Sequence, residues 1–387
     1  MRTLEIFSGA GGLALGLSQV GFRHVQLVEF NKQACKTLRK NFNPELVFEG
    51  DIRDFSFEKI NQIDFVAGGP PCQPFSLGGK HKASADNRDM FPYAVQAIRE
   101  LKPKGFIFEN VKGLLRKSFS DYFEYILLRL TYPSFSSSED CWERNFLLLK
   151  NMAENNKISS EYKVQFRLLN AADYGVPQTR ERVFIVGFRS DIKADWSFPE
   201  PTHSKTILVQ HQNLSNEYWI KHKLKKGKYT VSRHQNILKN GQQLALFPSK
   251  VLPWRTVRDA LGNVPHPNSE HNIPAHTFKD GAKSYPGHTG SFIDLPAKTL
   301  KAGVHGVPGG ENMIRYEDGS IRYFTVHEGK LLQTFPENYE ITGAWTEGMR
   351  QIGNAVPVAL ARVIGKSIID TLSKGTHSVE LQKSNVK

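Results

Sequence analysis

The chain has 387 residues and a formal net charge of +13, and 39% of its residues are hydrophobic. That length allows two domains with a sizeable core. The three cysteines, Cys35, Cys72 and Cys141, have neither a paired nor a metal-binding spacing, which excludes a disulfide framework and indicates a reducing compartment. The N-terminus lacks a signal-peptide pattern and we expect no membrane span, so we predict an intracellular protein.

Residues 1–190 alternate predicted strands and helices. This order is typical of a mainly parallel sheet covered by helices, so we expect an α/β, Rossmann-like fold. Residues 116–160 depart from the rhythm and predict a helical insertion. The strands are predicted at Thr3–Phe7, Val25–Glu29, Leu46–Phe48, Asp64–Ala67, Gly105–Glu109 and Val183–Phe188, and the helices at Gly12–Val20, Ala34–Asn41 and Tyr93–Leu101.

From about residue 191 the pattern becomes irregular and basic. Residues 201–260 contain 11 Lys or Arg and 2 Asp or Glu. Such an excess is typical of a nucleic-acid contact surface, although a solvated lysine-rich face would look the same. We expect a smaller irregular domain over 191–339, a return to the first domain over 340–374 with a helix at Val356–Leu372, and a flexible tail over 375–387.

A glycine-rich turn follows the first predicted strand. Residues 9–14 fit Gly-x-Gly-x-x-Ala, the strand-to-helix turn of a Rossmann unit, and Glu29 ends the second strand, where it could bind ribose hydroxyls. Phe30 could stack on an adenine, and Asp51-Ile52 could contact the adenine edge. The turn alone does not separate a dinucleotide from S-adenosylmethionine. The residues assigned here to a nucleoside cofactor are Phe7, Gly9, Ala10, Gly11, Gly12, Leu13, Glu29, Phe30, Asp51 and Ile52.

Cys72 lies between prolines in the run Gly-Gly-Pro-Pro-Cys-Gln-Pro-Phe-Ser, residues 68–76. The prolines stiffen the backbone, and the run follows a predicted buried strand. Open α/β sheets bind ligands at the carboxyl ends of their strands, so a rigid thiol there suggests a nucleophile. The alternative is a small buried hydrophobic residue, which is common for a free cysteine.

Three further motifs carry polar side chains. Glu109 ends an apolar strand, where burial would raise its carboxyl pKa and make it a proton donor; the alternative is a salt-bridged acid. Arg180 and Arg182 alternate along an extended segment and so share a face, which suits a phosphate or carbonyl clamp, or is solvated surface. Asn354 could cap the helix that follows it or contact a ligand.

Together these motifs closely resemble the DNA cytosine-5 methyltransferases of restriction-modification systems, in the family's order. The resemblance covers about 1–190 and 320–372. His327 stands where the family commonly has an arginine. The matching blocks are the glycine turn, Glu29, Asp51-Ile52, Pro70–Gln73, Glu109–Val111, Gln178–Arg182, 322–336 and Gln351–Pro357.

The resemblance implies S-adenosyl-L-methionine as cofactor and adds Pro71, Asn354 and Val356 to its binding residues. It implies that Cys72 attacks a cytosine flipped out of double-stranded DNA. It also implies that residues 1–190 and 340–374 form the catalytic, cofactor-binding domain and 191–339 the target-recognition domain. In the catalytic set, Cys72 forms the covalent bond, Glu109 binds ring nitrogen 3 and the amine, Arg182 binds the ring oxygen, and Arg180 supports the pocket. The candidate DNA contacts are Pro70, Gln73, Ser76, Lys80, Arg255, Arg258, Gly303, His305, Gly309 and Gly310.

The expected partners are double-stranded DNA and a cognate restriction endonuclease that recognises the same site. We expect a monomer, without a metal, in the cytoplasm of a prokaryote or a phage-infected cell. Three alternatives stay open. A transfer-RNA cytosine-5 methyltransferase would use the same cysteine chemistry, and a catalytically silent homologue would only bind nucleic acid. A nicotinamide oxidoreductase is more distant, because hydride transfer needs no cysteine nucleophile.

Overall fold

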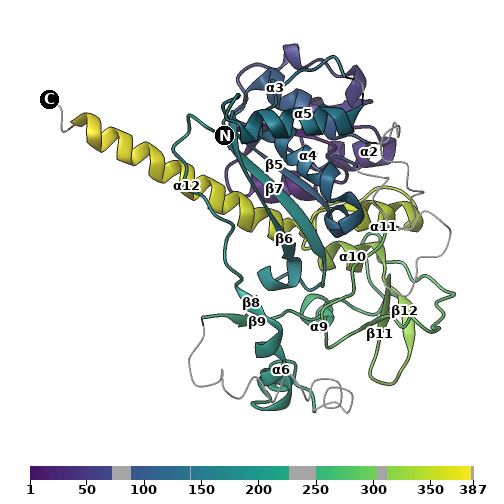
Figure 1. The fold of residues 1–387 in the computed structure, drawn as a ribbon. Coiled ribbons are helices and arrows are strands. Elements are labelled where there is room, and N and C mark those ends of the chain that lie inside the picture. Colours follow the sequence, from purple (N-terminus) through teal and green to yellow (C-terminus); the bar gives the residue numbers. More distant parts are fainter. Residues whose placement is uncertain (72–88, 140, 226–249, 303–311, 385–387) are drawn as a thin grey trace. The chain divides into compact units, whose positions relative to one another are not determined.

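The computed structural model describes residues 1–71, 89–139, 141–225, 250–302 and 312–384. The chain divides into two compact units (Figure 1). The first comprises Met1–Leu169, Glu181–Phe198 and Ile364–Lys387, and the second Asn170–Arg180 and Pro199–Val363. Residues 340–363 thus cluster with the second unit, whereas the sequence suggested grouping them with the first. The functional roles assigned to the domains stay predictions.

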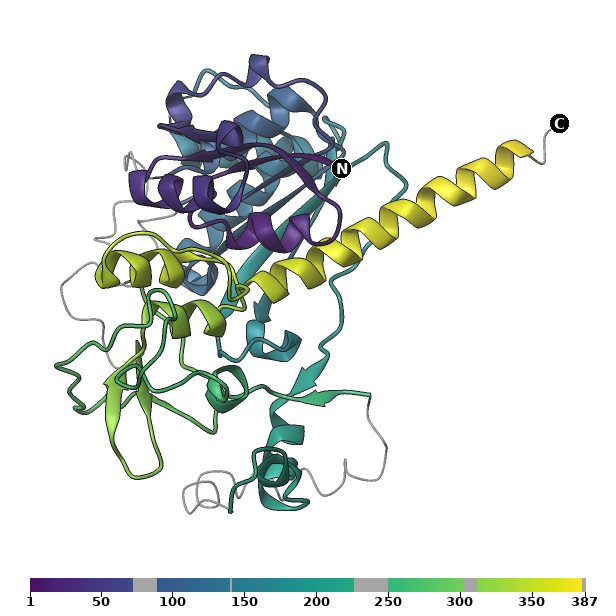
Figure 2. The ribbon, with the colours of Figure 1, turned by 180° about the vertical axis from the view of Figure 1, so that it is seen from behind.

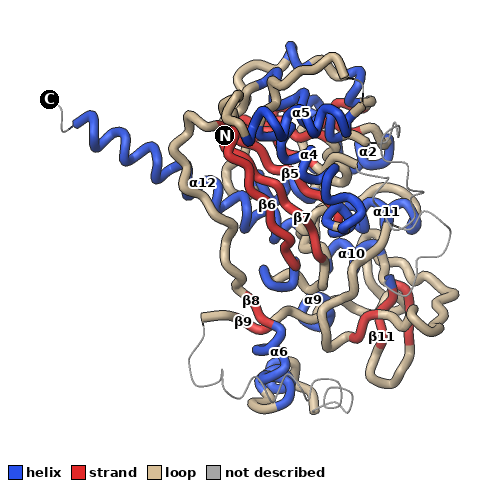
Figure 3. The backbone as a smooth tube through the Cα atoms, viewed as in Figure 1, coloured by secondary structure: helices blue, strands red, loops and turns tan. Residues whose placement is uncertain are grey.

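A seven-stranded sheet forms the centre of the first unit, in the order β3-β2-β1-β4-β5-β7-β6. Figure 3 shows its strands β5, β6 and β7 in red. The pairs β1–β2, β2–β3, β1–β4 and β4–β5 are parallel, and β5–β7 is antiparallel. The predicted mainly parallel α/β fold is therefore confirmed. The strands are β1 (Arg2–Ile6), β2 (Arg23–Glu29), β3 (Val47–Glu49), β4 (Phe65–Gly68), β5 (Gly105–Val111), β6 (Tyr162–Asn170) and β7 (Glu181–Arg189).

Helices of the first unit bury apolar stripes against this sheet. Helix α3, for example, buries positions 91, 94, 95, 97 and 98, the spacing of one helical face. The C-terminal helix α12 passes beside α1, where a Cβ on Gly365 would lie 2.8 Å from Leu17 (Figure 2). The helices are α1 (Gly12–Ser18), α2 (Lys32–Asn41), α3 (Phe91–Leu101), α4 (Ser120–Thr131) and α5 (Trp142–Glu154).

The strand order creates a switch point between β1 and β4, where successive chain connections leave in opposite directions. Open α/β sheets bind ligands in the crevice outside the strand ends at such a point. Packing is close here, because a Cβ added to Gly68 would lie 2.3 Å from the Ile6 carbonyl oxygen. The fold therefore brings the glycine turn after β1 and the proline run after β4 to one edge.

The second unit consists of short elements around a small core that includes Val257, Phe324 and Ile352. Its strands form a three-stranded sheet, β10-β11-β12, and a two-stranded sheet, β8-β9. Helix α10 lies within residues 322–336, one of the blocks that resemble the family. The elements are β8 (His203–Ser204), α6 (Lys205–Asn213), α7 (Glu217–Lys221), β9 (Leu252–Pro253), α9 (Val257–Leu261), β10 (Ser291–Phe292), β11 (Met313–Arg315), β12 (Ile321–Tyr323), α10 (Val326–Leu332) and α11 (Trp345–Asn354).

Helix α12 spans Val358–Ser384, which makes the predicted helix Val356–Leu372 too short. The helix continues into the predicted tail because no proline interrupts residues 373–384. Within the described residues, Trp345–Ser373 is long and apolar enough to cross a membrane, contrary to our expectation, but 61% of its apolar window is buried. This is weak support for a membrane span, since a buried core helix passes the same test.

Candidate active site

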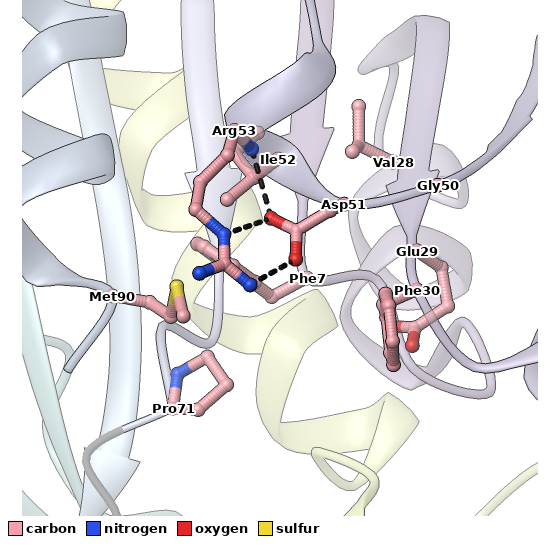
Figure 4. A pocket seen from close by; sticks show the side chains of 10 residues that line it. All are labelled: Phe7, Val28, Glu29, Phe30, Gly50, Asp51, Ile52, Arg53, Pro71 and Met90. Atoms are coloured by element: carbon pink, nitrogen blue, oxygen red, sulfur yellow. Dashed lines mark hydrogen bonds and ion pairs between the residues drawn. The ribbon is translucent and has the colours of Figure 1, made fainter. Parts of the chain in front are cut away.

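A cavity of about 330 Å³ opens at the carboxyl ends of β1, β2, β3 and β4 in the first unit (Figure 4). This is the switch-point edge of the sheet, where a nucleoside ligand is expected. Six residues predicted for the cofactor line it, and four others were not predicted. The predicted ones are Phe7, Glu29, Phe30, Asp51, Ile52 and Pro71; the others are Val28, Gly50, Arg53 and Met90.

The glycine turn lies at this edge of the sheet and contributes Phe7 to the cavity. Phe7, Gly9 and Gly11 have φ angles of 57°, 54° and 79°. Glycine takes such left-handed conformations without strain, which explains its presence at two of the three positions. Gly11 N–H donates to the Ser8 carbonyl over 2.9 Å and caps α1. Residues 9–13 do not line the cavity, and their predicted contact with the cofactor stays a prediction.

Glu29 ties the end of β2 to the glycine turn. Its Oε2 accepts a hydrogen bond from Gly9 N at 2.7 Å, and its Oε1 accepts one from Asn31 N at 2.7 Å. Asn31 in turn caps α2. Phe30 beside it has a side chain that is 72% exposed although it is large and apolar. An aromatic face left in solvent at a cavity is a surface on which a base can stack.

Asp51 and Arg53 form a bidentate ion pair in the cavity wall. Arg53 Nε donates to Asp51 Oδ1 over 2.8 Å, Arg53 Nη2 donates to Oδ2 over 2.5 Å, and Arg53 N donates to Oδ1 over 2.9 Å. These hydrogen bonds hold the pKa of Asp51 below its ordinary value. The sequence offered one signal for Arg53, its position two residues after a predicted ligand-binding acid.

Glu109 and Arg182 pair on the neighbouring antiparallel strands β5 and β7. Arg182 Nε lies 2.8 Å from Glu109 Oε1, and the two side chains are only 12% and 10% exposed. Burial lowers the pKa of the Arg182 guanidinium, and the Glu109 charge opposes this shift. Glu109 therefore makes a salt bridge, and its predicted role as a proton donor stays a prediction.

The segment Gly69–Pro71 connects this pair to the cavity. A Cβ on Gly69 would lie 3.5 Å from Glu109 Oε2, and Pro71 lines the cavity. Asn110, which had no predicted role, donates from Nδ2 to the Pro70 carbonyl over 2.9 Å. The chain therefore leaves β4 along the Glu109 carboxylate and reaches the cavity one residue before Cys72. The predicted residues Cys72, Gln73, Ser76 and Lys80 lie outside the described residues.

Arg180 does not lie on a solvated surface, which was one of the alternatives for it. It is fully buried in the second unit. Its Nη1 donates to the Leu300 carbonyl over 3.1 Å, and its Nη2 donates to the carbonyls of Gly353 and Ala355 over 2.6 and 3.0 Å. Tertiary contacts bury this guanidinium and commit it to backbone carbonyls, so the solvated-surface alternative is wrong for Arg180. The predicted face shared with Arg182 stays a prediction. The predicted support of the pocket by Arg180 stays a prediction as well.

Asn354 and Val356 lie at the junction of α11 and α12 in the second unit. Asn354 is the last residue of α11 and is exposed, so it does not cap the next helix, which begins at Val358. Val356 is buried. A Cβ on Gly353 would lie 2.4 Å from Ala302 N, so this junction packs tightly against backbone. Their assignment to the cofactor stays a prediction.

Arg258 is held by ion pairs within the second unit, and its predicted contact with DNA stays a prediction. Its Nε and Nη2 lie 2.5 and 3.1 Å from the carboxylate of Asp294, and Nη2 lies 3.1 Å from Glu317 Oε1. Arg255 is exposed and makes one long contact, of 3.5 Å, to the Asp259 carbonyl. The other predicted DNA contacts there, Gly303, His305, Gly309 and Gly310, lie outside the described residues, whereas Pro70 is buried in the first unit.

His327 is buried next to other cationic or titratable groups. Its ring centroid lies 5.5 Å from that of His276. Burial, followed by Lys330 and His276, lowers its pKa to about 4, so the imidazole is neutral at pH 7. It therefore does not replace the charge of the arginine that the family resemblance would put at this position.

The two described cysteines, Cys35 and Cys141, lie in different environments. Cys35 is buried, and burial raises the pKa of its thiol to about 12. Cys141 is exposed and its thiol donates to Glu143 Oε2 over 2.6 Å. The thiolate is the reactive form, so Cys35 is structural at neutral pH. The assignment of Cys72 as the nucleophile rests on its motif and on the family resemblance, and it stays a prediction.

Comparisons with known proteins agree with this geometry. The family model described as C-5 cytosine-specific DNA methylase matches residues 1–136 and 144–370. The type II methyltransferase M.NgoMIV of Neisseria gonorrhoeae is 31% identical over 375 residues, which cover 96% of this chain and 98% of that protein. The type II methyltransferase M.NgoFVII of the same organism is 31% identical over 394 residues, covering 100% and 91%.

Solved structures show the same fold at low identity. The Entamoeba histolytica methyltransferase EhMeth matches with a TM-score of 0.58 at 16% identity, covering 96% of this chain and 98% of that one. The S. pombe Dnmt2 methyltransferase matches with a TM-score of 0.56 at 17% identity, covering 97% and 99%. The fold, the motif order and the match to the family model over most of the sequence agree, and the chain belongs to the C-5 cytosine-specific DNA methylase family.

Proposed function

We propose that this DNA cytosine-5 methyltransferase moves the methyl group of S-adenosyl-L-methionine to a cytosine flipped out of a specific duplex sequence. The observation that carries the proposal is the segment Gly69–Pro71. It runs from the Glu109 carboxylate to the cavity and is bonded directly to Cys72. A nucleophile at this point would have a base-binding pair on one side and a nucleoside cavity on the other.

The cavity residues fit the proposed cofactor. Phe30 offers an aromatic face for adenine, and Asp51 offers a carboxylate for the exocyclic amine. Glu29 accepts backbone hydrogen bonds from Gly9 and Asn31, which hold its carboxylate at the cavity, and a carboxylate is an acceptor of the kind that ribose hydroxyls need. When bound, S-adenosyl-L-methionine supplies an electrophilic methyl group on its sulfonium.

The proposed reaction begins with addition of the Cys72 thiolate to carbon 6 of cytosine, which makes carbon 5 nucleophilic. Protonated Glu109 would donate to ring nitrogen 3 and accept from the amine, and Arg182 would bind the ring oxygen, so both would stabilise the adduct. Carbon 5 then attacks the methyl group, a base removes the carbon-5 proton, and the Cys72–carbon bond breaks to restore the ring. The ion pair between Glu109 and Arg182 holds both side chains in place before the base arrives.

The relatives suggest the biological setting. Because they are named type II methyltransferases, we propose that this chain modifies the site of a cognate restriction endonuclease, in a bacterial or phage-infected cytoplasm. It would act as a monomer on double-stranded DNA. Target recognition would belong to the second unit together with the basic stretch 201–260, and catalysis to the first.

The test is transfer of labelled methyl from S-adenosyl-L-methionine to mixed-sequence duplex DNA and, separately, to transfer RNA, followed by nucleoside analysis. We expect 5-methylcytosine in DNA, lost in Cys72→Ala and retained in Cys141→Ala, a matched control at an exposed thiol. Activity that survives Cys72→Ala would refute the covalent mechanism. Label in transfer RNA instead of DNA would refute the proposed substrate.

A further inference from the structure

The ion pair between Asp51 and Arg53 is built into the cofactor cavity rather than into the core. Both residues line the cavity, and dashed lines in Figure 4 mark their hydrogen bonds. The Arg53 side chain is 48% exposed and its partner is only two residues away. Such a pair contributes little to the folded state, because exposed ion pairs contribute little to stability. The role of this local, exposed pair is therefore in ligand binding at the cavity rather than in the stability of the fold.

The hydrogen-bond count at Asp51 differs between its two oxygens. Oδ1 accepts from Arg53 N and Arg53 Nε, whereas Oδ2 accepts from Arg53 Nη2. An sp² oxygen has two lone-pair sites, so these bonds saturate Oδ1 and leave one site on Oδ2. The planar guanidinium fixes the orientation of the carboxylate, since a bidentate pair has little rotational freedom.

An ionised carboxylate accepts hydrogen bonds and cannot donate them. Adenine presents an amine at carbon 6, whereas hypoxanthine presents a carbonyl oxygen there. A fixed acceptor facing that position pairs with the amine and opposes the carbonyl, because two acceptors cannot satisfy one another. The arrangement thus distinguishes the two purines by chemistry rather than by size.

We propose that Arg53 is a positioning residue that fixes Asp51 Oδ2 as the acceptor for the adenine amine and so makes the cavity select adenine over hypoxanthine. This inference rests on the proposed S-adenosyl-L-methionine site. Arg53 acts through Asp51 and has no part in methyl transfer itself, so its effect belongs to cofactor binding and to base preference.

The experiment is titration calorimetry of the full chain with S-adenosylhomocysteine and with its inosine counterpart. We expect Arg53→Ala to bind S-adenosylhomocysteine roughly tenfold more weakly, with the inosine compound changed by less than about twofold. Arg53→Lys should fall between, because an ammonium cannot make the bidentate pair. The matched control is Arg189→Ala, which removes a bidentate pair with Asp191, also two residues away and outside the cavity.

The outcomes separate the possibilities. A smaller adenine preference in Arg53→Ala, with unchanged Arg189→Ala, supports the inference. Equal weakening of both compounds would overturn it, since that is the signature of a structural role. Unchanged or tighter binding of S-adenosylhomocysteine to Arg53→Ala would overturn it as well. A wild-type chain that binds neither compound would reject the proposed cofactor site and, with it, this inference.

Discussion

Replacing Glu109 with Gln tests the central ion pair of the candidate active site. The pair has an N–O distance of 2.8 Å, and the side chains of Glu109 and Arg182 are 10% and 12% exposed. The buried Arg182 charge is therefore stabilised mainly by Glu109 rather than by water. Breaking a buried pair costs about 3–5 kcal/mol. We expect about 3 kcal/mol for Glu109→Gln, because the glutamine oxygen can still accept from Arg182. The thermal midpoint should fall by roughly 6–12 °C for a unit of this size.

Arg182→Gln should cost a similar amount, and the double variant should cost less than the two combined, by about 2 kcal/mol. All three variants should lose roughly 10²- to 10⁴-fold in methyl-transfer rate. The assays are thermal unfolding and labelled methyl transfer. The matched control is Lys112→Gln, which removes an exposed pair with Glu181 at 2.9 Å and should shift the midpoint little. Additive costs in the double variant, or a midpoint shift no larger than that of the control, would refute the reasoning.

Three further predictions concern packing, cofactor binding and pH. Gly68→Ala should prevent soluble folding, because its Cβ would lie 2.3 Å from the Ile6 carbonyl oxygen, whereas Gly69→Ala, with 3.5 Å to its nearest atom, should fold; soluble expression compares them. Phe30→Ala should leave the melting temperature unchanged, since its ring is 72% exposed, and weaken S-adenosylhomocysteine binding by roughly tenfold in calorimetry; unchanged affinity would remove the stacking role. His327 has a pKa of about 4 in the folded chain against an ordinary 6.5, so the unfolded chain binds the proton at a higher pH. The free energy of unfolding should therefore fall by up to about 3 kcal/mol as the pH drops from 6.5 to 4. Unfolding measured at several pH values should show a flatter decline in His327→Gln, and an identical decline would contradict this.

The parts of the fold with strong local signals could be predicted from the sequence. The first strands, the glycine turn and helix α3 depend on short apolar runs, required left-handed positions and helical spacing, which adjacent residues specify. Strand β6 was missed because it lies at the edge of the sheet and its burial does not alternate. Helix α11 was also missed, since Gly348 and Gly353 interrupt its helix-forming residues.

The site residues divide in the same way. Phe30 follows β2 and Asp51 lies two residues after β3, so their positions at strand ends bring them to the cavity. Arg180 shows the limit of that reasoning, because alternation along an extended segment predicts a face but not what covers it. For Glu109 the sequence left two environments open. Only the antiparallel pairing of β5 with β7 brings Arg182 within reach of the Glu109 carboxylate.

The three acceptors of Arg180 are main-chain oxygens, those of Leu300, Gly353 and Ala355. Every residue type offers such an oxygen, so the hydrogen bonds themselves do not select a side chain, although close packing requires glycine at position 353. Segments exchanged between related enzymes would then keep the anchor if their backbone follows the same path. A chimaera that imports Pro199–Val363 should also retain Asn170–Arg180, the short part of that unit that precedes β7 in the chain. Many side chains of this unit can therefore change without loss of the cross-link that Arg180 makes within it.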